Sequence, residues 1–228
     1  MLCFFIPKGK RIWTGNEQQR AVREPPLQKK DMDENRYDPL IKKYASEHRL
    51  PWLLIKSQIA IESSFNPNAQ STCGAKGLMQ LMPDTDFAID GEVDGFDPEG
   101  NIADGVRYDR WLYDHFPEIP RADERVKFML GAYNGGKGFI NKALQLARQE
   151  ELGFQPLILI TGKWQTWDFT CRLLKSEDCY IMSRGKRLRP KYEEIWDYIR
   201  KIGKQYDLYV SEESRPGTYP PDHTARNG

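Results

Sequence analysis

The sequence PWLLIKSQIAIESSFNP, residues 51–67, places a single carboxylate at the end of an apolar segment. Pro51 suits the first turn of a helix, where a missing N–H leaves no hydrogen bond unmade. The residues that follow are apolar on most helical faces, which predicts a helix buried in a core. Asn66-Pro67 predicts the end of that helix, because proline disfavours helical geometry in the residue before it. We therefore expect Glu62 at the carboxyl end of a buried helix.

The expected position of Glu62 favours the protonated form of its carboxyl group. The negative end of the helix dipole and the loss of hydration both raise the pKa of a carboxylate there. A raised pKa suits a general acid that works near neutral pH. The alternative interpretation is a glutamate that only reaches solvent at a helix end, and this segment alone does not separate the two.

Composition narrows the classes of function. The length of 228 residues fits one domain with appendages. The 34 Lys and Arg side chains balance 33 Asp and Glu, so charge gives no general argument for nucleic acid or an anionic membrane. No apolar run is long enough for a transmembrane helix, so we expect no stable membrane insertion.

Cysteine, histidine and basic residues give no sign of a metal, cofactor or nucleic-acid site. The four cysteines lack metal-ligand spacing, although Cys171 and Cys179 could close a short loop. The three histidines do not support a His-based metal site or a catalytic triad. Residues 183–189 hold four basic side chains in seven, which fits a solvated hairpin better than a nucleic-acid site.

The chain divides into an arm, one domain and a tail. Residues 1–36 are polar and predict an arm, and residues 211–228 predict a loose tail. Between them, residues 37–210 predict a mainly α domain with an insertion at about 152–190. The apolar run 157–160 predicts a strand of a small β-hairpin in that insertion.

Apolar residues at helical spacing predict the other helices of the domain. One of them is a short helix between Gly77 and the proline at position 83. The other expected helices are one that starts at Asp38, one from Asp97 to Phe116, one over 122–133, one from Gly138 to Glu150 and one from Pro190 to Tyr206.

Two further motifs follow the segment that carries Glu62. Residues 74–83 read GAKGLMQLMP, and residues 132–136 read AYNGG at the end of a predicted helix. Together with ESSFNP at 62–67, their order and spacing resemble the soluble lytic transglycosylases, whose relatives include the goose-type lysozymes. The resemblance covers roughly residues 38–150, and the last helix also fits the family pattern.

The resemblance implies a lysozyme-like helical domain with a groove for peptidoglycan glycan strands. Glu62 matches the single catalytic acid of the family. Tyr192 is the candidate for a tyrosine that approaches the acid from the last helix, although the insertion leaves its placement open. Met79 and Tyr133 have core packing as an alternative interpretation. The residues expected to bind substrate are Ser63, Met79, Gln80, Tyr133, Asn134 and Tyr192.

The resemblance also implies cleavage of the glycan without water. Protonated Glu62 would donate to the oxygen that links N-acetylmuramic acid to N-acetylglucosamine, while the acetamido oxygen of the substrate stabilises the sugar carbon. The resulting carboxylate would take the proton of the muramoyl 6-hydroxyl, which closes a 1,6-anhydro ring.

Two other functions stay open. Asp84, Asp86 and Asp90 either form a solvated loop or position a water, as aspartates do in the goose-type lysozymes. The second case would make the protein a hydrolase, a muramidase, but Met82-Pro83-Asp84-Thr85 resembles the transglycosylases more closely. A non-catalytic glycan-binding or virion structural module could keep the same fold, and the presence of Glu62 argues against it.

The start of the chain lacks the pattern of an export signal. Residues 2–6 are apolar, but basic residues follow them instead of preceding them. Because the expected substrate lies in the periplasm or outside the cell, we expect delivery by a phage particle, a pore or secretion machinery. A phage or prophage enzyme is the leading hypothesis, and a secreted bacterial enzyme without its leader is the alternative.

Overall fold

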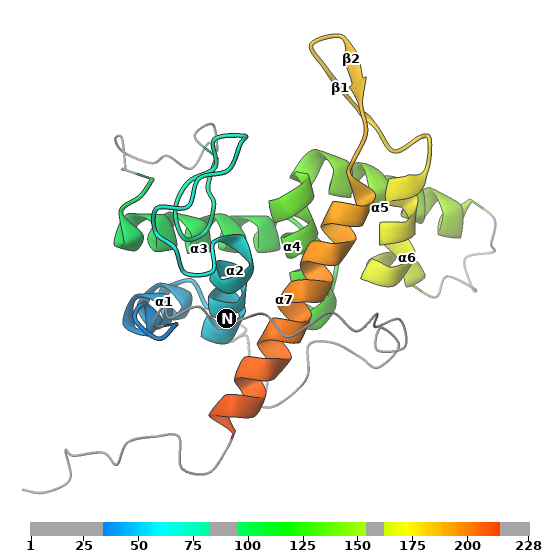
Figure 1. Ribbon diagram of the computed structural model, residues 1–228. Coiled ribbons are helices and arrows are strands. Elements are labelled where there is room, and N and C mark those ends of the chain that lie inside the picture. The colour runs from blue at the N-terminus through cyan, green and yellow to red at the C-terminus, as the bar shows by residue number, and fades with distance from the viewer. Residues whose placement is uncertain (1–33, 83–94, 154–161, 215–228) are drawn as a thin grey trace, which may run out of the picture.

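Helices make up most of the computed structural model, which describes residues 34–82, 95–153 and 162–214 (Figure 1). The α-helices are α1 (Asp38–Glu47), α2 (Trp52–Glu62), α3 (Pro98–Asp114), α4 (Ala122–Gly135), α5 (Lys137–Leu152), α6 (Trp167–Cys171) and α7 (Tyr192–Glu213). Two short 3-10 helices, η3 (Lys163–Gln165) and η4 (Arg172–Lys175), flank α6, and strands β1 (Ile181–Ser183) and β2 (Lys186–Leu188) form a hairpin.

Helix α2 is buried, as its apolar sequence predicts. Every residue from Leu53 to Ile59 is buried, including the polar ones. The buried Ser57 hydroxyl has a hydrogen-bond partner within the helix, because it donates to the Leu53 carbonyl at 2.6 Å. The helix ends at Glu62, earlier than the proline predicts, because Ser64 and Phe65 turn into the left-handed region with φ of 50° and 62°.

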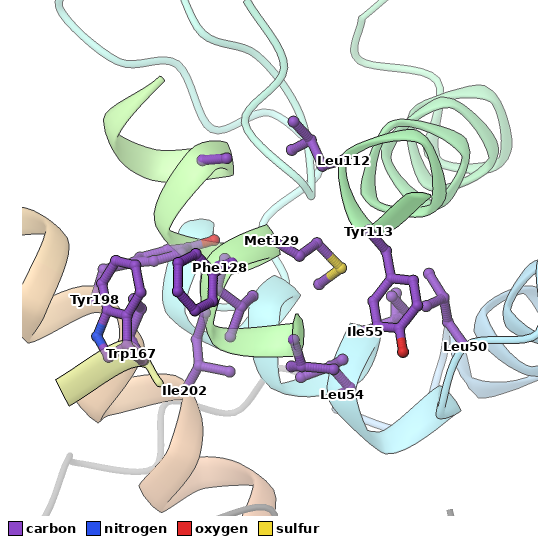
Figure 2. Packing of buried hydrophobic residues seen from close by; sticks show 14 of the residues in the cluster. Leu50, Leu54, Ile55, Leu112, Tyr113, Phe128, Met129, Trp167, Tyr198 and Ile202 are labelled. Atoms are coloured by element: carbon purple, nitrogen blue, oxygen red, sulfur yellow. The ribbon is translucent and has the colours of Figure 1, made fainter. Parts of the chain in front are cut away.

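The core joins α2, α4, α6 and α7 (Figure 2). Phe128 of α4 and Trp167 of α6 meet edge to face, with ring centroids 5.3 Å apart. Gly131 makes room for the indole, because a Cβ at this position would lie 2.5 Å from the Trp167 ring. This contact places the insertion helix α6 against the domain.

The short helix expected between Gly77 and the proline at position 83 is not formed in the described part, which ends at residue 82. These residues make a turn, with isolated β-bridges from Gln70 to Lys76 and from Lys76 to Leu81. Gly77 and Gln80 have φ of 78° and 48°, which a right-handed helix does not allow. The prediction failed because the sequence does not reveal a left-handed Gln80.

The hairpin projects from the helical body (Figure 1). Its strands are antiparallel, with Ile181 opposite Leu188. The sequence therefore places a hairpin correctly in the insertion, but the expected strand at 157–160 lies outside the described residues. Cys171 and Cys179 are both buried, and no disulfide joins them.

Helix α7 extends to Glu213, beyond the end expected at Tyr206 and into the first residues of the expected tail. The helix continues because Tyr206 and Tyr209 remain on its buried face. Residues 1–33 of the expected arm and residues 215–228 of the expected tail lie outside the described residues.

Candidate active site

The carboxyl group of Glu62 lies at the carboxyl end of α2, partly exposed, where the sequence predicts it. The Tyr198 hydroxyl donates a hydrogen bond to Glu62 Oε1 at 2.6 Å. Burial raises the pKa of Glu62 from 4.5 to about 7, while the hydrogen bond from Tyr198 acts in the opposite direction. The pKa of Glu62 is therefore raised, as the sequence predicts. A carboxyl group with such a pKa can both donate and accept a proton near neutral pH.

The tyrosine whose hydroxyl reaches Glu62 is Tyr198 instead of the expected Tyr192, whose role in binding substrate stays a prediction. Tyr198 is buried, and it lies on the face of α7 that also carries Ile195 and Ile202. Tyr192 is the first residue of α7, about 9 Å along the helix axis from Tyr198, and Lys175 Nζ lies 4.1 Å from its ring centre. Helical spacing predicts this helix, but it does not show which of its tyrosines lies deepest in the core.

Tyr133 is anchored to the loop that follows α2. Its hydroxyl donates to the Met79 carbonyl at 2.6 Å, and its ring packs on Tyr108 with centroids 5.4 Å apart. Burial, together with the negative charge of Glu62, raises the pKa of Tyr133 well above its usual value, so the phenol stays neutral. Tyr133 is therefore fixed close enough to Glu62 to feel its charge.

The other expected substrate-binding residues serve the architecture in this structure. The Met79 side chain is fully buried, and Gln80 Nε2 donates to the carbonyls of Ala69 and Gly77 at 3.0 and 2.9 Å. The Ser63 hydroxyl donates to the Ile59 carbonyl at 3.1 Å. Their binding roles stay predictions, as does that of the exposed Asn134.

A second carboxyl group, which sequence reasoning missed, lies buried near the site. Asp109 of α3 has no exposed surface, and Gln58 Nε2 of α2 donates to its Oδ1 at 3.2 Å. Burial raises the pKa of Asp109 well above its usual value, and the charge of Glu62 adds to the effect. The sequence signal was available, because Asp109 shares a helical face with the buried Ile102 and Val106.

The described residues offer no group of three or more His, Cys, Asp or Glu side chains that could hold a metal ion. None of the helices in the described ranges has the length and apolar character needed to cross a membrane.

Comparison with protein families gives a match that runs from α1 to the end of α5. The family described as "Transglycosylase SLT domain" matches residues 39–152. The chain belongs to this family. The match includes Glu62, Asp109 and Tyr133, and it ends before α7 and Tyr198.

Curated relatives carry the name membrane-bound lytic murein transglycosylase F. The protein of this name from Desulfosudis oleivorans is 36% identical over 173 residues, which cover 76% of this chain and 36% of the relative. The one from Vibrio cholerae is 35% identical over 167 residues, which cover 73% of this chain and 31% of the relative. The chain thus matches about a third of the length of these relatives.

Two solved structures share the fold. The 70 kDa soluble lytic transglycosylase SLT70 from Escherichia coli superposes with a TM-score of 0.54 and 24% identity, covering 78% of this chain and 24% of that chain. An inactive mutant of the lytic transglycosylase Slt from Pseudomonas aeruginosa gives a TM-score of 0.51 at 19% identity, covering 78% and 25%. The mainly α, lysozyme-like fold expected from the sequence is confirmed.

Proposed function

We propose that this protein is a peptidoglycan lytic transglycosylase that cleaves the β-1,4 bond between N-acetylmuramic acid and N-acetylglucosamine. The observation that carries the proposal is the environment of Glu62, whose burial raises its pKa to about 7 while Tyr198 holds one carboxyl oxygen. The curated relatives, named murein transglycosylases, support peptidoglycan as the substrate.

The hydrogen bond from Tyr198 orients the proton of Glu62. Since Oε1 accepts a hydrogen bond from the phenol at 2.6 Å, we place the acidic proton on Oε2. In the first step Oε2 donates this proton to the glycosidic oxygen as the bond from that oxygen to the muramoyl carbon breaks, so N-acetylglucosamine leaves with a free hydroxyl. The acetamido oxygen of the substrate stabilises the positive sugar carbon that remains. In the second step the Glu62 carboxylate removes the proton of the muramoyl 6-hydroxyl, whose oxygen attacks that carbon and closes the 1,6-anhydro ring.

Asp109, the buried carboxyl group near Glu62 among the described residues, gives no support for attack by water. A hydrolase that inverts its substrate needs a second carboxylate to activate a water on the opposite face of the sugar. Asp109 is fully buried, and its side chain is held by Gln58, so it does not reach a substrate. Asp84, Asp86 and Asp90, the aspartates that could serve a hydrolase, lie outside the described residues.

The product distinguishes the possible functions. Purified peptidoglycan is digested, and the muropeptides are analysed by mass spectrometry without prior reduction. The proposal predicts ends that are lighter by one water and resist borohydride, because the anhydro sugar has no free reducing carbon. Reducing muramoyl ends would identify a muramidase, and undigested glycan with a folded protein would identify a binding module.

The route of the protein to its substrate is a separate proposal. Delivery by a phage particle or secretion machinery, the leading hypothesis from the sequence, stays a prediction. The curated relatives are named as membrane-bound, which favours a bacterial enzyme of the cell envelope instead. The genes next to this one decide between them, since the phage proposal requires phage or secretion genes there.

A further inference from the structure

The buried pair of Gln58 and Asp109 contains two polar atoms without partners. Gln58 Nε2 donates to Asp109 Oδ1 at 3.2 Å. Among the described residues, Gln58 Oε1 and Asp109 Oδ2 make no hydrogen bond, although both are buried. A buried acceptor that lacks a donor destabilises the fold, so this arrangement requires an explanation.

A single proton on Asp109 would give both of these atoms a hydrogen-bond partner. A protonated carboxyl group has a donor on one oxygen and an acceptor on the other, and a primary amide has the complementary pair. If Asp109 carries its proton on Oδ2, that O–H can donate to Gln58 Oε1 while Oδ1 keeps its bond from Nε2. The two unsatisfied atoms are thus the two that a cyclic acid–amide pair would join.

We propose that Asp109 is a neutral carboxylic acid in the working protein, joined to the Gln58 amide by two hydrogen bonds, and that this pair positions Glu62. The inference rests on the proposed function only where it concerns the rate of glycan cleavage. The protonation state of Asp109 is a property of the folded chain and is tested without a substrate.

The groups around Asp109 favour its neutral form. It has no exposed surface, and the charge of Glu62 at the end of α2 opposes a second negative charge. Among the described residues, Tyr108 on α3, Tyr133 on α4 and Tyr198 on α7 also interact electrostatically with this cluster, and all three have raised pKa values. They are uncharged phenols near neutral pH and provide no positive charge that would stabilise an aspartate anion.

The pair acts on Glu62 through the geometry of α2. Gln58 lies four residues before Glu62, so both project from the same face of the helix, one turn apart. Fixing Gln58 to α3 sets the rotation of the last turn of α2 about its axis, and this rotation determines where the Glu62 carboxyl group points. Asp109 is thus a positioning residue that does not touch the substrate.

The test uses the pH dependence of stability in Asp109→Asn. Asparagine keeps both hydrogen bonds to Gln58 but cannot ionise. In the wild type, a pKa raised by folding means that stability is lost as pH rises above the unfolded value of about 3.9. The Tm of Asp109→Asn should therefore match that of the wild type near pH 4 and exceed it by about 3 °C or more at pH 7. Glu62 is present in both proteins, so its own titration cancels.

The opposite result overturns the proposal. If Asp109 were an anion stabilised by the fold, Asp109→Asn would lose Tm as pH rises from 4 to 7. Carbon-13 NMR of the wild-type carboxyl groups gives the same answer without a variant, and is decisive if Asp109→Asn folds poorly. The Asp109 resonance should keep the chemical shift of a protonated acid at pH 7, and a titration centred near pH 4 would refute its neutrality.

The positioning role has its own readout. Asp109→Leu removes both hydrogen bonds, and should lower kcat at least tenfold with little change in KM, whereas Asp109→Asn should rescue kcat. The basic limb of the pH–rate profile of Asp109→Asn should coincide with that of the wild type, because no charge has been removed. A limb displaced to lower pH, or equal kcat values for the Leu and Asn variants, would contradict the proposal. An inactive wild type would refute the proposed function and leave the stability and NMR results standing.

Discussion

The proposed reaction places the whole proton transfer on Glu62. In Glu62→Gln, the amide has nearly the same shape but cannot donate and retake a proton. We expect a folded protein whose rate of wall clearance falls by about 10²–10⁴-fold, the range that a positioned acid contributes. Turbidity of purified bacterial walls measures the rate, and circular dichroism controls for folding. A folded Glu62→Gln that kept more than a few per cent of the wild-type rate would exclude Glu62 as the acid.

The pH dependence of activity should report the raised pKa of Glu62. Only the protonated carboxyl group can donate to the glycosidic oxygen, so kcat/KM should fall as pH rises through about 7, the pKa that burial gives Glu62. Rates on purified peptidoglycan between pH 4 and 9 locate this limb. A basic limb at or below the ordinary glutamate value of 4.5 would show that burial does not set the pKa of this group.

Tyr198 should tune this limb, whereas Tyr192 should not. The Tyr198 hydroxyl stabilises the carboxylate and thereby lowers the pKa of Glu62. Tyr198→Phe removes that donor, so the basic limb should move to higher pH. Tyr192→Phe is the matched control on the same helix and should leave the position of the limb unchanged. Equal shifts in both variants would mean that the hydrogen bond is not what distinguishes Tyr198.

Single residues differ in how far the sequence reveals them. Glu62 was predictable because an apolar run and a stop signal place it at a helix end, and the neighbouring motifs support it. Tyr198 was not, because α7 carries several tyrosines and only the packing of α7 against α2 decides which one meets Glu62. Asp109 was overlooked because a charged residue in an amphipathic helix is normally solvated, although its place on the apolar face of α3 marked it as unusual.

At the scale of elements, the contact between α4 and α6 depends on Gly131, which has no side chain to collide with Trp167. A Cβ at Gly131 would lie 2.5 Å from the rigid ring of Trp167, so Gly131→Ala should destabilise the fold by about 1–3 kcal/mol through overpacking. Gly138→Ala in α5 is the matched control, since its Cβ would meet Ile181 at an ordinary 3.6 Å. That change should be neutral or stabilise by up to about 1 kcal/mol. Urea unfolding of both variants measures the difference, and equal losses would contradict the packing argument.

Helices were easier to predict than the turns between them. The periodicity of apolar residues located α1 to α5 and α7, because each of these helices buries one face or is buried throughout. Residues 77–82 were wrongly expected to be helical. Gln80 has a φ of 48°, and its side-chain amide donates to the carbonyls of Ala69 and Gly77. These hydrogen bonds form only in the folded chain, so the local sequence does not predict them.

At the scale of the molecule, the family match does not contain the complete site. It covers residues 39–152, whereas Tyr198 comes from α7. A protein that ends after residue 190 should lose lytic activity and its cooperative thermal transition, because it lacks the buried face of α7 that includes Ile195, Ile199 and Ile202. Calorimetry and wall clearance test both expectations. A truncated protein that melts cooperatively and clears walls would show that α7 is dispensable.

The separation of Glu62 and Tyr198 along the chain also sets the time at which the site is completed during synthesis. The two residues are 136 positions apart, and Tyr198 belongs to the last helix that the structure describes. A nascent chain on the ribosome therefore carries Glu62 long before the tyrosine that holds its carboxyl group emerges. Chains released early by a stalled or aborted translation event would contain the acid without its partner, so a cell making this protein accumulates the assembled site only from chains translated through α7.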